Sequence, residues 1–221
     1  MRSLAKPIVL QHALLASLLS TLACVPRLAM WQERIFTVPF MSVTLLFCTF
    51  VLWAFVFAWH EQYSGARVFN WKFQPLLWAI GTAYALVSAA SLHFSLDDKL
   101  RVITPQVYPT NWSSWAAITL FSLTLEPLFL CFAPFAFFIR LSNRETTAVG
   151  FTIVFGLLVV YLNLNSGKTL PGMGMMAELI ALRVVSAFVN VFFYLKGGVL
   201  LVWWIALVIQ LRFLLEPWAA H

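Results

Sequence analysis

The feature that most constrains this chain is a run of twenty-two residues, 38–59, without a single charged side chain. About 20 apolar residues are enough for an α-helix to cross the hydrocarbon core of a bilayer. Of the 221 residues, 62% are hydrophobic and only 10% are charged, whereas soluble domains are about half apolar and about a quarter charged. We therefore expect an integral membrane protein.

Similar apolar runs follow one another along the whole sequence. They predict an all-α polytopic bundle of about seven transmembrane helices in a single domain, 1–221, and the length leaves room for six to eight spans. Because proline lacks the backbone N–H of a helix ladder, Pro127 is expected to kink the fourth span. The expected spans are 8–25, 38–59, 76–95, 115–139, 147–164, 173–195 and 199–215.

The connections between these runs predict the orientation. With the N-terminus inside, the inner connections hold seven Lys and Arg residues and the outer connections hold six. Since inner loops of membrane proteins are richer in Lys and Arg, we predict that the N-terminus lies inside. The first run follows Arg2 and Lys6, as in a signal peptide, but we expect it to be retained as the first span.

The charged and sulfur-containing residues narrow the range of partners. The 14 Lys and Arg residues are scattered singly along the chain, nearly all of them in the connections, whereas nucleic-acid binding needs a dense basic patch. Nucleic acid is therefore excluded as a partner, and membrane lipids and other membrane-protein subunits are expected instead. Cys24, Cys48 and Cys131 lie inside apolar runs, so no disulfide framework is expected.

A few polar side chains fall at membrane depth, where an ionised group costs at least about 2.5 kcal/mol. Such a group must be paired, face a cavity or serve a function. Glu126 is the strongest functional candidate because it precedes Pro127 and has no cation within thirteen residues; a buried structural role is the alternative. The polar residues expected to be buried in the bundle are Glu126, Glu178, Arg183, Asn190 and Gln210.

Arg183 needs a partner at this depth. Glu178 is five residues away on the same expected helix, about 140° around its axis, which is a poor arrangement for an ion pair. Glu126 is the other carboxylate at membrane depth. We therefore predict that Arg183 pairs with Glu126 from a different span.

His12 and His93 also lie at membrane depth. Neither has a second His, Cys or carboxylate at metal-ligand spacing, so no protein metal site is expected. A lone intramembrane histidine can be the axial ligand of a tetrapyrrole pigment, and the 21 Phe and 10 Trp would suit a bound pigment or lipid. The alternative is a packing histidine that is simply hydrogen-bonded. No cofactor is required by the sequence.

The carboxyl half resembles a known family. The stretch Leu-Glu-Pro-Leu-Phe-Leu-Cys at 125–131, followed by an apolar run to Leu141 and by Gly-Phe-Thr-Ile-Val-Phe at 150–155, resembles the core of the CAAX prenyl protease and bacteriocin-processing (CPBP) membrane proteins. The stretch Phe-Tyr-Leu-Lys-Gly-Gly-Val-Leu at 193–200 is similar to that family's final hairpin. The resemblance covers residues 115–215.

The resemblance implies a protease scaffold without its catalytic groups. Active members of the family carry three motifs. The first is a Glu-Glu pair with an Arg four residues after the second Glu, the second is a Phe with a His four residues later, and the third is a His with an Asn four residues later. In these enzymes the Glu carboxylate activates water. Glu126 matches the second Glu and Phe155 matches the Phe. The remaining positions hold Leu125, Leu130, Val159, Ala206 and Gln210. No catalytic residue is therefore expected, and Glu126 would be catalytic only in a working protease.

These observations predict a non-catalytic CPBP-like membrane protein that acts as a structural or accessory subunit of a larger membrane complex. Transport is not favoured, because few polar side chains are available to line a pathway. Two alternatives stay open. One is an intramembrane endopeptidase of the CPBP type, and the other is a pigment- or lipid-binding membrane subunit, for example of a photosynthetic complex.

Overall fold

The computed structural model describes residues 4–31, 37–64, 68–70, 72–165 and 172–215. Within these ranges the chain is almost entirely helical and has no β-strand, which confirms the all-α prediction. The elements are α1 (Pro7–Trp31), α2 (Thr37–Trp59), η1 (His60–Ser64), α3 (Pro75–Ser91), η2 (Leu92–Leu96), α4 (Asp97–Ile103), η3 (Pro105–Val107), α5 (Trp112–Pro127), η4 (Leu128–Phe132), α6 (Ala133–Ser142), α7 (Glu145–Asn165), α8 (Met173–Gln210) and η5 (Leu211–Leu215).

Six helical segments in the described ranges are long and apolar enough to cross a membrane. The chain therefore has the architecture of an integral membrane protein. Because a bilayer offers no water to the backbone, a helix is the way for such a segment to satisfy its own N–H and C=O groups. The six segments are Pro7–Met30, Thr37–Tyr63, Pro75–Ile103, Trp112–Ser142, Glu145–Leu162 and Met173–Leu215.

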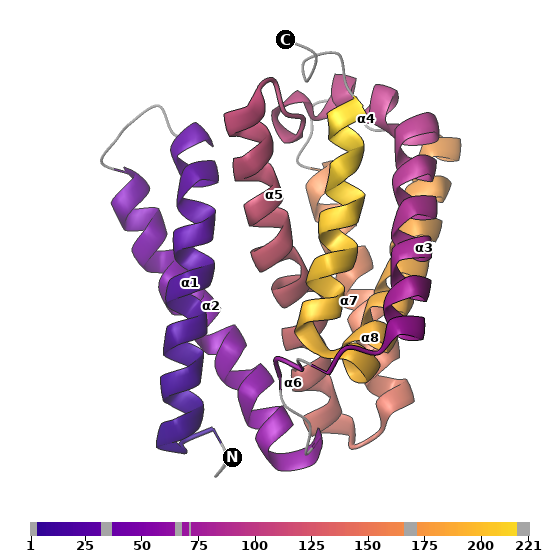
Figure 1. The fold of residues 1–221 in the computed structure, drawn as a ribbon. Helices are drawn as coiled ribbons and strands as arrows, with labels where there is room; N and C mark the ends of the chain where they lie inside the picture. The colour runs from indigo at the N-terminus through magenta and orange to yellow at the C-terminus, as the bar shows by residue number, and fades with distance from the viewer. Residues whose placement is uncertain (1–3, 32–36, 65–67, 71, 166–171, 216–221) are drawn as a thin grey trace.

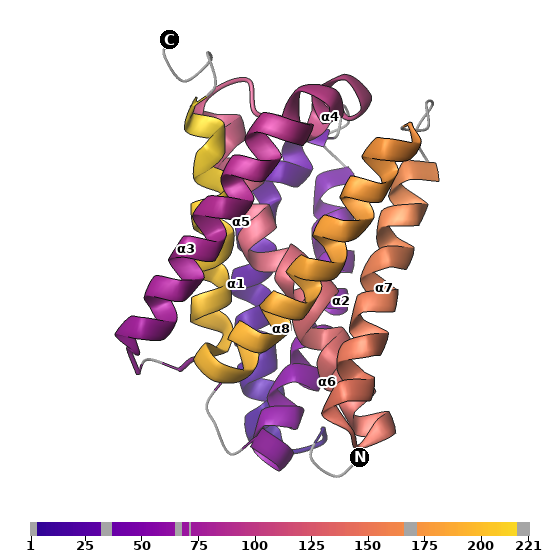
Figure 2. The same cartoon turned by 90° about the vertical axis from the view of Figure 1, so that its right-hand side faces the viewer.

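The last of these six segments, Met173–Leu215, contains the last two expected spans, 173–195 and 199–215, so the six segments cover all seven expected spans. Gly198 interrupts this segment, since its φ of 75° and ψ of −171° are not helical. Figures 1 and 2 show that α8 folds back at this point, so that its two arms form a hairpin. The two arms are called here the first arm (173–197) and the second arm (199–210).

The expected fourth span, 115–139, is not one uniform α-helix. It begins earlier, at Trp112, because Asn111 caps it: Asn111 Oδ1 accepts a hydrogen bond from the Ser114 backbone N–H at 2.8 Å. After Pro127 the chain makes a π-helical turn, Leu128–Phe132, before it continues as α6. Proline removes a backbone donor, and π-helical turns inside α-helices are frequent at functional sites.

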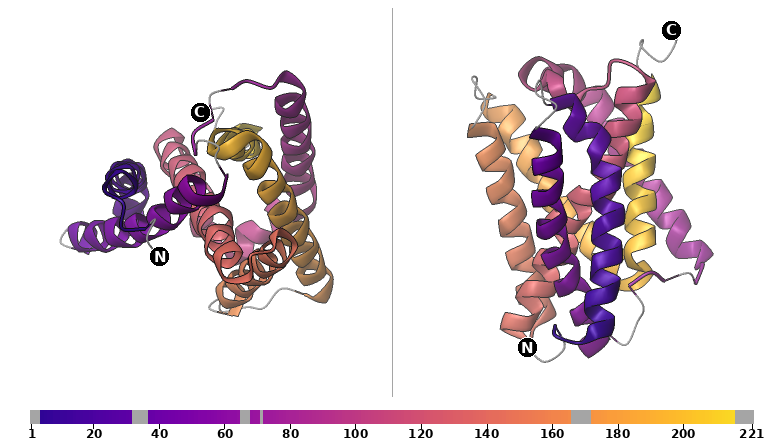
Figure 3. Two further views of the ribbon diagram at one scale, coloured as in Figure 1. Left: turned by 90° about the horizontal axis from the view of Figure 1, so that it is seen from below. Right: turned by 90° about the vertical axis from the view of Figure 1, so that its left-hand side faces the viewer.

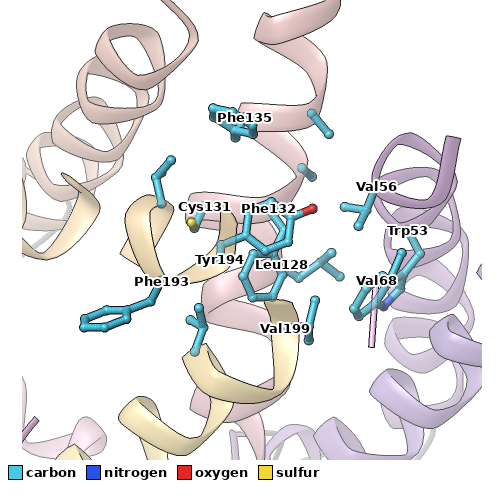
Figure 4. Close-up of a cluster of buried hydrophobic side chains, with 14 of the residues drawn as sticks. Trp53, Val56, Val68, Leu128, Cys131, Phe132, Phe135, Phe193, Tyr194 and Val199 are labelled. Atoms are coloured by element: carbon cyan, nitrogen blue, oxygen red, sulfur yellow. The ribbon is translucent and has the colours of Figure 1, made fainter. Parts of the chain in front are cut away.

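The core lies where α2, η4, α6 and the hairpin of α8 meet. Trp53, Phe132 and Tyr194 are fully buried there, beside Leu128 and Val199 (Figure 4). The Trp53 indole N–H donates to Ser20 Oγ of α1 at 3.0 Å, so its polar atom is satisfied as well. Helices α1 and α2 pack against each other and cover one side of the bundle (Figure 3).

A smaller group of side-chain contacts, apart from the main core, lies at the end of the bundle where α4 is found. Asp97 is buried and forms an ion pair with Arg212 Nε at 3.0 Å. Tyr108 donates a hydrogen bond from its hydroxyl to Asp97 Oδ1 at 2.9 Å. These contacts tie the segment after α3 to the end of α8, two parts of the chain that are far apart in sequence.

Candidate functional site

A polar cavity of about 160 Å³ lies between α5, η4 and the two arms of α8. Four of the five polar residues predicted at membrane depth line it together, although they come from α5 and both arms of α8. They are Glu126, Arg183, Asn190 and Gln210, joined by Ser122. The structure therefore concentrates most of the intramembrane polar groups in one place.

Glu126 projects into the cavity from the last turn of α5. The Ser122 hydroxyl, one helical turn earlier, donates a hydrogen bond to Glu126 Oε1 at 2.9 Å. Glu126 was predicted to lie buried in the bundle; it lines the cavity, and the residue keeps exposed surface. The carboxylate is thus oriented by one hydroxyl and accessible to whatever enters the cavity.

Arg183 reaches the cavity from the first arm of α8. Its guanidinium lies against Gly156 of α7, where an added Cβ would meet Nε at 2.8 Å and Nη2 at 3.0 Å. The Arg183 Nε atom is buried and has no hydrogen-bond partner within the described residues. Because residue 156 is a glycine, there is room for the Arg183 guanidinium at this position.

The predicted ion pair between Glu126 and Arg183 is wrong as a direct contact. Among the described residues, no nitrogen atom of Arg183 lies within 4.0 Å of a Glu126 carboxylate oxygen, the distance that defines an ion pair. The two residues line the same cavity from different helices, so any electrostatic coupling between them acts without direct contact.

Asn190 and Gln210 reach the cavity because α8 folds back at Gly198, which brings the first and second arms face to face. Gln210 Oε1 is buried and lacks a hydrogen-bond partner among the residues described. The backbone carbonyl of Gln210 accepts a hydrogen bond from Trp115 Nε1 at 3.2 Å, which ties the second arm to α5. Both residues were predicted to be buried in the bundle, and each is partly exposed.

Glu178 does not line the polar cavity. It lies near the start of α8 and is partly exposed rather than buried, as is Arg183. Because it keeps exposed surface near the start of the helix, Glu178 needs no partner inside the bundle.

The cavity also contains positions selected by the family resemblance. Glu126, Leu130, Ala206 and Gln210 all line it. Phe155 lies on α7, where its ring is 5.4 Å from that of Phe129. Leucine and alanine thus stand at two positions where the resemblance expects Arg and His.

The cavity combines the Glu126 carboxylate with hydrogen-bond donors from Ser122, Arg183, Asn190 and Gln210. Leu130 and Ala206, where the resemblance expects Arg and His, supply no donor. In the described ranges, no group of three or more His, Cys, Asp or Glu residues is placed to hold a metal ion.

The two candidate tetrapyrrole ligands lie apart from the polar cavity and on different helices. His12 of α1 lines a second cavity, of about 610 Å³, between α1 and α2. His93 lies on the π-helical turn η2 after α3, with its ring 5.0 Å from that of Phe94. Neither position tests whether a pigment binds, so that role stays a prediction.

Sequence reasoning overlooked His60. This histidine is buried, and its Nε2 lies 2.9 Å from the Tyr194 hydroxyl, in a hydrogen bond between the end of α2 and the first arm of α8. It directly follows the uncharged run 38–59 and precedes Glu61, so its place in the sequence is typical of a residue in the headgroup region. Only the packing of η1 against α8 buries it.

Fold and site together define an all-α integral membrane protein with a polar cavity between its helices. No family model, curated protein or solved structure matches this chain.

Proposed function

We propose that the protein is a non-catalytic CPBP-like membrane protein that serves as a structural or accessory subunit of a larger membrane complex. The observation that carries this proposal is the composition of the polar cavity, where Glu126 stands beside Leu130 and Ala206. A site with this lining can hold a polar group of a partner, but it is poorly equipped to cleave a peptide bond.

The reasoning rests on what hydrolysis requires. A carboxylate can take a proton from water as a general base. The tetrahedral intermediate must also be stabilised by positioned donors, and losing one such donor typically costs about 10²–10³ in rate. Leu130 and Ala206 stand where the resemblance expects Arg and His, and neither side chain offers a donor. The polar side chains that are present, those of Arg183, Asn190 and Gln210, suit the binding of a polar group of a partner, so we favour binding without turnover.

Peptidase assays in proteoliposomes test the non-catalytic part. The substrates are prenylated peptides and single transmembrane peptides, and the proteins are the wild type and the Glu126→Gln variant. We expect no cleavage by either protein. Cleavage by the wild type that is lost in Glu126→Gln would instead support the intramembrane endopeptidase.

Isolation from the native membrane tests the accessory part. The protein is extracted in a mild detergent, cross-linked and analysed by mass spectrometry. We expect at least one other membrane protein to be recovered in a fixed ratio, and in reduced amount with Glu126→Gln or Arg183→Leu. Recovery of the chain alone would contradict the proposal, and recovery of a coloured cofactor would favour the pigment-binding alternative.

A further inference from the structure

The cavity of about 610 Å³ between α1 and α2, called here the α1–α2 cavity, is distinct from the polar cavity. Its volume falls in the range of about 300–1,000 Å³ that is usual for small-molecule sites. Apolar side chains of α1 make one wall, and Phe57, Val68 and Phe69 contribute to another. Three polar side chains interrupt this lining: His12, His60 and Glu61.

Two of these three polar groups have partners in the protein. His60 is hydrogen-bonded to the Tyr194 hydroxyl at 2.9 Å. Glu61 forms an ion pair with Lys6 Nζ at 2.9 Å. His12 differs from both, because its exposed imidazole makes no hydrogen bond to another residue within the described ranges. Its ring lies 5.6 Å from that of Phe57.

The position of His12 along α1 sets its depth. The Lys6–Glu61 pair is half-exposed and, as a charged pair next to the start of α1 at Pro7, it belongs at the level of the lipid headgroups. His12 lies five residues after Pro7, about 8 Å further along a helix that rises about 1.5 Å per residue. This depth places His12 at the boundary between the lipid headgroups and the hydrocarbon core. A polar group left without a partner there is costly.

The charges at this cavity also limit its ligand. Lys6 and Glu61 neutralise each other, so they provide no net charge to attract an anionic or a cationic headgroup. Beyond His12 the wall of α1 continues with Leu15 and Leu19, which suits an apolar chain. The lining thus matches a molecule with one neutral polar group followed by a hydrocarbon tail.

We propose that the α1–α2 cavity binds a neutral membrane lipid whose polar group accepts a hydrogen bond from the His12 imidazole. The tail lies along Leu15 and Leu19, and the polar group lies just below the Lys6–Glu61 pair. A neutral imidazole carries one donor and one acceptor, so a carbonyl group completes its hydrogen bonding. This site is independent of the accessory role proposed for the polar cavity.

A benzoquinone with a decyl chain is a suitable probe, because it has neutral carbonyl groups and an apolar tail. Binding to the purified full-length protein is followed by quenching of tryptophan fluorescence. Trp53 can report on the site, since its ring lies 5.6 Å from that of Phe57 and 6.0 Å from that of Phe69. We expect saturable quenching in the wild type.

The variants separate a specific site from partitioning into detergent. His12→Leu should raise the Kd about fivefold to tenfold, the effect of one lost hydrogen bond, whereas His12→Gln keeps a donor and should retain most of the affinity. Ala16→Phe fills the cavity and should abolish saturable quenching. His93→Leu, a histidine variant away from this cavity, is the matched control and should bind as the wild type does. Thermal unfolding of each variant checks that it is folded.

Three results would overturn the proposal. Equal affinity in the wild type and His12→Leu would show that the imidazole does not contact the probe. Tighter binding of decanoate than of the quinone would mean that the site selects an anion. Binding of haem with an absorption spectrum that His12→Leu abolishes would make the cavity a tetrapyrrole site instead.

Discussion

The guanidinium of Arg183 packs against Gly156, in the space that a side chain at position 156 would enter. A Cβ at position 156 would lie 2.8 Å from Arg183 Nε. Gly156 therefore leaves room for Arg183, the cation that lines the polar cavity among the described residues. This contact joins α7 to the first arm of α8.

The first prediction concerns this contact. Replacing Gly by Ala inside a helix normally stabilises it by about 1 kcal/mol. Gly156→Ala should lack that gain, because the new methyl group must displace the guanidinium, whereas Gly150→Ala on the same helix should show it, since nothing lies within 4 Å of a Cβ there. Unfolding in mixed detergent micelles measures the difference. In an Arg183→Leu background the two substitutions should become equivalent, and a persistent difference would mean that another contact is responsible.

The second prediction is that Glu126 and Arg183 are coupled across the cavity. Breaking a buried ion pair typically costs about 3–5 kcal/mol, but these groups are not in direct contact, so we expect a coupling of about 1 kcal/mol. Arg183→Leu should destabilise the protein, and Glu126→Gln in addition should recover part of the loss. A double-mutant cycle measures this. In the control cycle Glu178→Gln replaces Glu126→Gln, and the two losses of stability should be additive because Glu178 lies outside the cavity. Additive losses in both cycles would disprove the coupling.

The third prediction concerns the turn of the α8 hairpin. Gly198 has φ 75° and ψ −171°, a region essentially restricted to glycine, and an added Cβ would lie 3.1 Å from the Val68 carbonyl oxygen. Gly198→Ala should therefore destabilise the protein by about 1–3 kcal/mol. Gly174→Ala, also in α8 but with nothing within 4 Å, should be neutral or stabilising. Equal free energies of unfolding for the two variants would mean that the hairpin does not need this conformation.

The fourth prediction concerns alkaline pH. Burial raises the pKa of the Tyr108 hydroxyl above its ordinary value, and the adjacent Asp97 carboxylate raises it further. In the unfolded chain this hydroxyl titrates near pH 10. Above that pH the unfolded chain has released a proton that the folded protein keeps, so stability should fall as pH rises; below about pH 10 the full contribution remains.

Two variants check the role of Tyr108. Tyr108→Phe removes the hydrogen bond to buried Asp97, which should cost about 1.5–3 kcal/mol at neutral pH, as for hydrogen bonds to charged groups. It should also make stability less dependent on pH above 10. Tyr161→Phe, at an exposed position of α7, is the control and should change neither quantity. An unchanged alkaline slope in Tyr108→Phe would assign the effect to another group.

The sequence alone determined the class of the protein and the approximate place of its helices. Runs such as 38–59 predict transmembrane helices, because a segment of that length and hydrophobicity must satisfy its own backbone hydrogen bonds in a bilayer. The interruption after Pro127 was likewise predictable, since proline has no N–H to donate. Boundaries were less secure: the cap at Asn111 starts α5 three residues before the expected span.

Only the tertiary structure decided which polar groups meet. The sequence marked Glu126, Arg183, Asn190 and Gln210 as residues at membrane depth, but their shared cavity depends on the fold of α8 at Gly198 and on its approach to α5. The direct pairing of Arg183 with Glu126 was wrong, and the guanidinium lies instead against Gly156 of α7, a third helix. Hydropathy is a property of each segment by itself, whereas contacts between helices depend on side-chain packing across segments that are distant in sequence.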